Sequence, residues 1–211
     1  MTAPAAATAS SARDSDRRTG HRGARTEGRG AQTRAAILAR AVDLASVEGL
    51  EGLTIGRLAS ELGMSKSGLF AHFGSKQELQ LATVAAATDR FRAVVVEPAA
   101  AEAEGLPRLR ALAGRYIDHV EGGAYPGGCF WASTSAEYDD RPGPVRDAIA
   151  AAMAAWTGEL ERQAAIAGLE RPAQVAFELY AVGTAANSRY RLSGDGRVFG
   201  YAREAVERLL R

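Results

Sequence analysis

Residues 51 to 79 read EGLTIGRLASELGMSKSGLFAHFGSKQEL, and this stretch decides the fold of the chain. Within it, Thr54 precedes four apolar residues at the i, i+3, i+4, i+7 spacing of one helix face, namely Ile55, Leu58, Ala59 and Leu62. A threonine before such a stripe is typical of a helix N-cap, because its hydroxyl accepts a hydrogen bond from a free backbone N–H of the first turn. Gly63 follows, and glycine adopts the positive φ of a tight turn without strain. The pattern predicts a short amphipathic helix that ends at Gly63.

The next residues predict a second short helix packed on the first. Ser65 provides another capping hydroxyl, and Leu69 and Phe73 mark the buried side of a helix that starts at Lys66. Ala59 is small enough to let the two backbones approach where they cross. Two short helices joined by such a turn form a helix-turn-helix.

A helix-turn-helix places the N-terminal side chains of its second helix in the major groove of DNA, while capping hydroxyls, free N–H groups and cations hold phosphates. The residues predicted to face base edges are Lys66, Ser67, Gly68 and Ala71. The residues predicted to contact phosphates are Thr54, Ser65, His72 and Lys76. A helical hairpin is also compatible with plain packing, and His72 and Lys76 also fit ordinary surface positions. DNA binding is favoured because the capping, turn and stripe signals agree within one stretch.

The segment from Thr33 to Leu79 resembles the DNA-binding domain of the TetR family of regulators. The resemblance rests on Thr54, Ala59, Gly63, Ser65, Phe70, His72, Phe73 and Lys76. It implies that Lys66 and Ser67 face bases and that Phe70 stands where a tyrosine is common, so that one phosphate hydrogen bond is missing. It also implies that the remainder of the chain is an effector-binding and dimerisation domain. The implied partners are a double-stranded DNA operator with an inverted repeat, a second copy of the chain and a small-molecule effector, with no cofactor.

The rest of the sequence predicts an all-α fold. Gly74 ends the second short helix, and Ser75-Lys76-Gln77-Glu78 has the pattern of a capping box for a longer helix. Helical spacing and Gly/Pro punctuation predict helices near 33–48, 75–97, 107–121, 129–138, 144–167, 172–192 and 197–210. We expect three parts: a disordered basic arm over 1–30, a three-helix DNA-binding domain over 31–79, and a ligand-binding and dimerisation domain over 80–211.

Composition narrows the class of protein. Residues 1 to 30 carry six arginines against three acidic residues, whereas residues 31 to 79 carry five basic and five acidic residues. We therefore expect the arm to strengthen DNA binding without choosing the sequence, the alternative being a dispensable solvated leader.

No apolar run is long enough for a membrane helix, and no secretory signal pattern precedes the arginines, so we expect a cytoplasmic protein without a membrane partner. The single cysteine and three scattered histidines predict neither a disulfide nor a metal site.

The last two predicted helices, 172–192 and 197–210, carry apolar and small residues on more than one face. This pattern favours contacts on two sides, to the domain core and to a second copy of the chain, which together predict a homodimer built on four helices. The alternative is that both helices belong to the core of a monomer.

A ligand cavity is predicted from aromatic and polar-tipped side chains between residues 107 and 190. The candidate lining residues are Tyr116, His119, Cys129, Trp131, Tyr138, Trp156, Phe177 and Tyr180. Aromatic residues at helical spacing also fit a plain core, and Cys129 in the segment GGCFW fits either a small buried group or a reactive thiol. Because no nucleophile and base have the spacing of a catalytic set, the sequence predicts a ligand-responsive regulator and not an enzyme. The rival hypothesis is a helical small-molecule-binding or interaction protein that keeps the fold without specific DNA binding.

Overall fold

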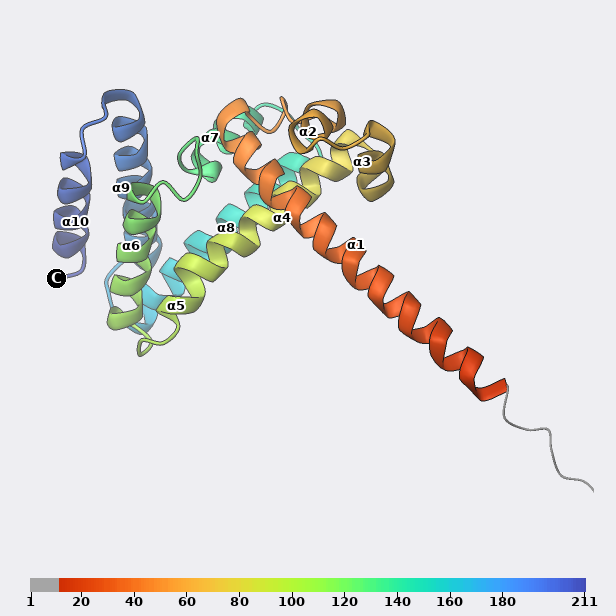
Figure 1. Cartoon of the computed structure of the whole chain (residues 1–211). Coiled ribbons are helices and arrows are strands. Elements are labelled where there is room, and N and C mark those ends of the chain that lie inside the picture. The colour runs from red at the N-terminus through yellow and green to blue at the C-terminus, as the bar shows by residue number, and fades with distance from the viewer. Residues whose placement is uncertain (1–11) are drawn as a thin grey trace, which may run out of the picture. The chain divides into compact units, whose positions relative to one another are not determined.

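The computed structural model describes residues 12–211 (Figure 1), which divide into two units, one that ends at Ile37 and one from Leu38 to Arg211. Helix α1 (Ala12–Glu48) runs through both units. It therefore includes residues 12–30, where a disordered arm was expected, while residues 1–11 lie outside the described part of the chain. No proline interrupts this stretch and its six arginines are good helix formers, but it also contains four glycines, which disfavour a helix, so residue type alone does not explain why the helix extends before Thr33. The predicted domain limits at residues 30 and 79 stay predictions.

The two predicted short helices are present and are capped as the sequence indicates. Thr54 accepts a hydrogen bond from the N–H of Arg57 at 3.1 Å before α2 (Ile55–Leu62), and Ser65 accepts one from the N–H of Gly68 at 3.1 Å before α3 (Lys66–Phe73). Gly63 ends α2 with a φ of 61°, in the left-handed region. The buried side chains of the pair are Leu58, Ala59, Leu69 and Phe73.

Only half of the predicted capping box forms at the start of α4 (Lys76–Phe91). The hydroxyl of Ser75 accepts a hydrogen bond from the N–H of Glu78 at 3.1 Å. The N–H of Ser75 donates to the carbonyl of Phe73 at 2.7 Å, which leaves it no bond for the Glu78 carboxylate. In a complete capping box the Glu78 carboxylate would accept the hydrogen bond from the N–H of Ser75. Here the tight connection from α3 provides that acceptor instead.

Helix α4 continues without a break through η1 (Arg92–Val96), a π-helical segment, into α5 (Glu97–Ala99). Pro98 lies just after the π turns. Because proline has no N–H and its ring clashes with the carbonyl four residues earlier, a wider turn before it avoids the conflict that ends most helices. The helix predicted to end near residue 97 therefore reaches Ala99.

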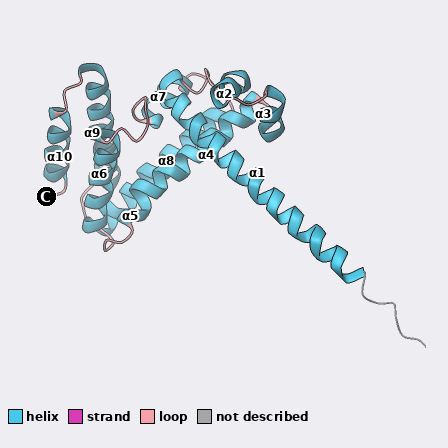
Figure 2. Ribbon diagram, in the orientation of Figure 1, coloured by secondary structure: helices cyan, strands magenta, loops and turns pink. Residues whose placement is uncertain are grey.

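The remaining helices follow the predicted limits within one or two residues. They are α6 (Leu106–Glu121), α7 (Phe130–Tyr138), α8 (Pro144–Ile166), α9 (Pro172–Ser193) and α10 (Arg197–Leu209). Helix α8 packs against α4, α6, α7 and α9, and Figure 1 shows α6, α9 and α10 side by side. Residues 12–211 contain no strand (Figure 2), which confirms the all-α prediction. Within these residues, no helix combines the length and the apolar character needed to cross a membrane.

The φ of Gly63 generates a stability prediction. We expect Gly63→Val to lower the free energy of unfolding by about 1–2 kcal/mol, because a β-branched residue is strained in the left-handed region. Gly63→Asn is the matched control, since asparagine tolerates this region best among residues with a Cβ. Urea denaturation of both variants checks the prediction. Equal stability of the two variants would contradict it.

Candidate DNA-binding face and ligand cavity

The solvent side of α3 carries the residues that were predicted to face DNA. Lys66, Ser67, Phe70 and Ala71 are exposed, while Leu69 on the opposite side is fully buried. The Phe70 ring is 54% exposed, which is unusual for an unpartnered phenylalanine. Gly68 and His72 are only half-buried. The predicted base-facing residues therefore share one accessible surface on the second helix of the motif.

The two lysines of this region have different surroundings. A Cβ built at Gly56 would lie 3.4 Å from Cε of Lys66, so the Lys66 stem lies against the first turn of α2. Among the ion pairs of residues 38–211, none includes Lys66. Lys76, by contrast, donates a short hydrogen bond to the carboxylate of Glu51. A phosphate would have to compete with Glu51 for Lys76, but it would not displace a partner from Lys66.

Glu51 is the centre of a polar cluster that links the helix-turn-helix to α7. Its carboxylate accepts hydrogen bonds from Lys76 and from the hydroxyl of Tyr138, the latter at 3.1 Å, and the bond from Lys76 is the main reason why the pKa of Glu51 is lowered. Gln80 on α4 donates to the same Tyr138 oxygen at 3.0 Å and to the carbonyl of Leu50 at 2.9 Å. Tyr138 was predicted to line the ligand cavity. Its position at the end of α7 directs it to this cluster, and it does not line the cavity described below.

The neighbouring residue on α7 holds the connection between α1 and α2. The carboxylate of Glu137 accepts hydrogen bonds from the backbone N–H groups of Leu50 and Glu51 at 2.7 and 2.8 Å. A Cβ built at Gly49 would lie 2.8 Å from Oε1 of Glu137, and Gly49 has a φ of 82°. Glycine is thus needed at this position both for the backbone conformation and for the approach of the carboxylate. Two backbone amides anchored on one carboxylate fix this loop to α7.

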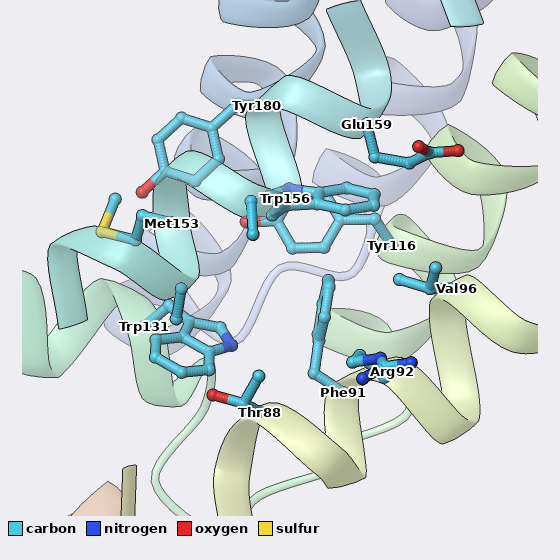
Figure 3. A pocket seen from close by; sticks show the side chains of 12 residues that line it. Thr88, Phe91, Arg92, Val96, Tyr116, Trp131, Met153, Trp156, Glu159 and Tyr180 are labelled. Carbon is cyan, nitrogen blue, oxygen red and sulfur yellow. The ribbon is translucent and has the colours of Figure 1, made fainter. Parts of the chain in front are cut away.

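A cavity of about 190 Å³ lies between α4–η1, α6, α7, α8 and α9 (Figure 3). Four of the predicted ligand residues line it: Tyr116, Trp131, Trp156 and Tyr180. The other lining residues are Thr88, Phe91, Arg92, Val96, Ala152, Met153, Ala155 and Glu159. The four that come from α4 and η1 lie outside residues 107–190, where the cavity was predicted, so they were not predicted. In the sequence, an aromatic residue at Phe91, seven residues before Pro98, was the feature that could have indicated a wall residue from this helix.

Five aromatic side chains line the cavity. The ring centroids of Phe91 and Trp156 lie 5.0 Å apart and those of Tyr116 and Trp156 lie 5.5 Å apart, both with edge-to-face geometry. The Tyr180 ring lies parallel to that of Tyr116 at 6.5 Å. A Cβ built at Gly183 would lie 2.2 Å from the Tyr116 ring, so glycine in α9 leaves room for this ring. The wall is closely packed and holds its rings in fixed orientations.

The charged groups at the cavity are already engaged with other parts of the chain. Glu159 accepts hydrogen bonds from Arg162 and from Gln163, each at 2.9 Å. Arg92 is largely exposed and lies 4.0 Å from the Glu97 carboxylate. By contrast, Nε1 of Trp156 is buried and has no hydrogen-bond partner. This nitrogen has almost no accessible surface, so it does not face the cavity. Among the described residues, the charges of the cavity wall are therefore compensated by other parts of the chain.

The remaining predicted ligand residues lie elsewhere. Phe177 is 64% exposed on α9, because Ala176 and Leu179 occupy the buried side of that helix, and it does not line this cavity. Cys129 is buried at the N-cap of α7, and burial raises the pKa of its thiol, which argues against a reactive thiolate. His119 faces a separate hollow beside α6, which is lined by Val94, Arg115, Asp118, Gly122 and Ala124.

The sequence and the fold match one family of regulators along most of the chain. The family model for bacterial regulatory proteins of the tetR family matches residues 37–83, and the model for the tetracyclin repressor-like C-terminal domain matches residues 105–206. A helix-turn-helix followed by a helical ligand-binding domain defines a class of one-component transcriptional regulators. The chain belongs to the TetR family of this class. A comparison with curated proteins finds no match.

Several solved structures share the fold. A TetR-family regulator from Streptomyces coelicolor is 25% identical, with a TM-score of 0.73 over 86% of this chain and 95% of that one. A TetR regulator from Chloroflexus aurantiacus is 23% identical, with a TM-score of 0.75 over 86% and 94% of the two chains. The regulator AibR, determined in complex with isovaleryl coenzyme A and operator DNA, is 26% identical, with a TM-score of 0.68 over 84% and 98%.

His119 generates a prediction about pH. Its ring packs between Phe91 and Tyr125, with both centroids 5.3 Å away, and neither ring nitrogen has a hydrogen-bond partner. Burial, helped by the charge of Arg90, lowers the pKa of His119 from 6.5 to about 4. Between pH 6.5 and pH 4 the unfolded chain binds a proton at this histidine and the folded chain does not. The contribution of His119 to the free energy of unfolding is therefore fully present above pH 6.5 and is lost as the pH falls towards 4.

We therefore expect the free energy of unfolding to fall more steeply below pH 6.5 in the parent protein than in His119→Phe, by up to about 3 kcal/mol at pH 4. Phenylalanine keeps the ring and removes the proton-binding nitrogens. Urea denaturation at a series of pH values measures the difference, and His72→Gln is the control for the loss of a histidine from α3. Parallel pH profiles for the parent and His119→Phe would rule out this role.

Proposed function

We propose that this protein is a ligand-responsive transcriptional repressor that acts in the cytoplasm. It binds a palindromic operator as a homodimer through α2 and α3, and it releases the operator when a small molecule occupies the cavity. The observation that carries the proposal is the uninterrupted helical stretch α4–η1–α5, from Lys76 to Ala99. It starts immediately after the exposed helix α3 and supplies Phe91 and Arg92 to the cavity wall.

The proposed base contacts come from the first turn of α3. Lys66 and Ser67 are exposed there, and Lys66 has no ion-pair partner among the described residues. The exposed Phe70 ring offers an apolar surface of the kind that contacts thymine methyl groups or the sugar backbone. Thr54 and Ser65 lie at helix N-termini, where backbone N–H groups favour phosphate oxygens. The arginines of residues 1–30 are proposed to add attraction that does not depend on the DNA sequence.

Two connections support coupling between cavity and operator. The first is α4–η1, which contacts both sites along one rigid element. The second is α7, because Trp131 near its start lines the cavity while Glu137 and Tyr138 at its end bind Leu50 and Glu51. A ligand that displaces Trp131 would therefore also strain the hydrogen bonds that fix the loop before α2. Linkage requires that operator DNA lower the affinity for the ligand by the same factor.

The proposed dimer surface lies on α9 and α10. These helices carry three large apolar side chains that are exposed in the single chain: Phe177, Leu192 and Tyr201. The small residues Ala176, Gly183 and Ala186 are buried against the chain's own core, so the exposed residues lie on a different face. Apolar residues on an otherwise polar helix surface are typical of a subunit interface.

We expect Tyr201→Asp combined with Phe177→Asp to convert a dimer into a monomer at micromolar concentration, because two charges would be buried in the interface without partners. Analytical ultracentrifugation measures the mass. Val94→Asp, which changes another exposed apolar residue outside α9 and α10, is the control and should leave the dimer intact. A parent protein that is monomeric while it retains full operator affinity would contradict the proposal.

Operator binding tests the DNA-binding face. We expect Lys66→Ala to weaken binding to an operator selected from a random-sequence library by about tenfold to a hundredfold, and Ser67→Ala to relax the preference at one base position. A lost base contact costs about 1–3 kcal/mol at that position and spares unrelated DNA. Lys76→Ala is the comparison, because a phosphate contact weakens all sequences alike. Fluorescence anisotropy with operator and scrambled DNA separates the two patterns, and an equal loss on both DNAs would make Lys66 a phosphate contact.

A further inference from the structure

The loop between α6 and α7, residues 122–129, packs tightly against the end of α1. The N–H of Gly127 donates a hydrogen bond to the hydroxyl of Ser46 at 3.0 Å, and Ser46 is buried. A Cβ built at Gly127 would lie 1.7 Å from the backbone oxygen of Ser46, so only glycine lets the two backbones come this close. We call this segment the α6–α7 loop.

Arg90 of α4 binds both sides of this contact. Its guanidinium donates to the carboxylate of Asp43 on α1 at 2.8 Å and to the carbonyl of Ala124 in the α6–α7 loop. The same guanidinium lies 4.7 Å from the centre of the buried Tyr125 ring. Because the donors of a guanidinium form a rigid planar fork, these bonds fix α1, α4 and the loop relative to one another.

Helix α9 holds the other side of the α6–α7 loop. The side-chain oxygen of Asn187 accepts a hydrogen bond from the N–H of Cys129 at 3.0 Å, and Arg191 one turn later donates to the carbonyl of Pro126 at 3.3 Å. The next residue, Leu192, is 91% exposed and belongs to the proposed dimer surface. None of these residues lines the cavity. The loop therefore connects the proposed dimer helix to α1 by a route separate from the ligand site.

The end of α1 is in turn tied to the helix-turn-helix. Arg57 on α2 pairs with Glu48 at 2.6 Å, and Arg40 on α1 pairs with Glu61 on α2. In each subunit a series of direct contacts thus leads from α9 through the α6–α7 loop and α1 to α2 and α3. In a helix-turn-helix dimer, the distance between the two recognition helices determines the spacing of the half-sites.

We propose that the α6–α7 loop sets the distance between the two α3 helices of the dimer, and with it the spacing of the operator half-sites, with Arg90 and Asn187 as the positioning residues. The inference rests on the proposed function, since it requires a homodimer and an operator with two half-sites. It adds a determinant of operator choice that lies outside the residues proposed to contact DNA.

Operators with altered spacing test the proposal. The probes are an operator that the full-length protein selects from a random-sequence library, and the same half-sites with one or two base pairs inserted or removed at the centre. One added base pair moves a half-site by about 3.4 Å and rotates it by about a tenth of a turn. We expect it to weaken binding of the parent protein by about tenfold or more, measured by fluorescence anisotropy.

Two variants release the loop from its partners. Arg90→Met keeps the aliphatic stem but loses both hydrogen bonds, and Asn187→Leu removes the acceptor for the N–H of Cys129. Each should reduce the penalty for one added base pair to about threefold or less, while the preferred bases within each half-site stay the same, because α3 is unaltered. Arg108→Met is the matched control, since Arg108 also binds backbone carbonyls and a carboxylate, but near the start of α6. If Asn187→Leu does not fold, Ser46→Ala detaches the loop from α1 with a smaller change.

A second measurement needs no DNA. A spin label on Ser60→Cys, at an exposed position of α2, gives one label in each subunit, and the buried Cys129 is shielded from the reagent. Electron–electron resonance then measures the distribution of distances between the two labels of the dimer. We expect a narrow distribution in the otherwise unchanged protein and in Arg108→Met, and a broader one in Arg90→Met and Asn187→Leu.

An unchanged spacing preference and an unchanged label distribution in Arg90→Met and Asn187→Leu would overturn the proposal, and so would equal effects in Arg108→Met. A parent protein that binds its operator equally well at every spacing would also overturn it, while the proposed function would stand. If the parent protein selects no operator but the label distribution broadens as expected, the loop positions the helices and the proposed function fails. A monomeric parent protein would overturn both.

Discussion

The continuity of the helix from Lys76 to Ala99 is the constraint on which the rest of the structure depends. Helix α3 is only eight residues long and buries two side chains, so it cannot hold its position alone. It is fixed by α2 and by the first turn of α4. Sixteen residues after Lys76, the same continuous helix becomes the π-helical segment η1, which places Arg92 and Val96 at the cavity. In the proposed function, this continuous helix carries a displacement at the cavity to the helix-turn-helix.

The polar cluster around Glu51 adds a second connection of a different physical kind. The packing of α4 against α8 is apolar and tolerates small sliding movements, whereas the bonds from Glu137 to the N–H groups of Leu50 and Glu51 depend on direction and distance. A carboxylate that loses two backbone donors must regain water, and the two amides must do the same. In the proposed function, making and breaking these bonds gives the loop before α2 two arrangements, as a switch between two DNA affinities requires.

The sequence predicted features that depend on neighbours within a few residues and missed those that depend on distant ones. Thr54, Gly63 and Ser65 act within one turn of their own position, so residue type and spacing were enough to place both helices of the motif. The bonds of Tyr138 to Glu51 and Gln80 could not be predicted, because these partners are separated from it by 87 and 58 residues. Phe91 was missed for the same reason, since only the packing of α4 on α8 makes it a wall residue. The half-formed capping box at Ser75 shows that even a local pattern gives way when a preceding turn satisfies the same N–H.

The charges of the helix-turn-helix separate attraction to DNA from the choice of sequence. Between residues 38 and 79, Arg40, Arg57 and Lys76 are each paired with a glutamate of the same region, and Lys66 is the basic residue left without such a pair. The two charges of an ion pair cancel at a distance. The long-range electrostatic attraction between this face and a polyanion is therefore weak. Its recognition must then act at short range, through one lysine, hydroxyls and the N–H groups of two helix N-termini. Of these contacts, the proposed base contacts of Lys66 and Ser67 depend on the base sequence, whereas the proposed phosphate contacts fix only the position of the protein on the duplex. A face of this kind therefore discriminates between sequences more than it attracts DNA, and the arginine-rich residues before it are the part of the chain with the charge to supply the attraction.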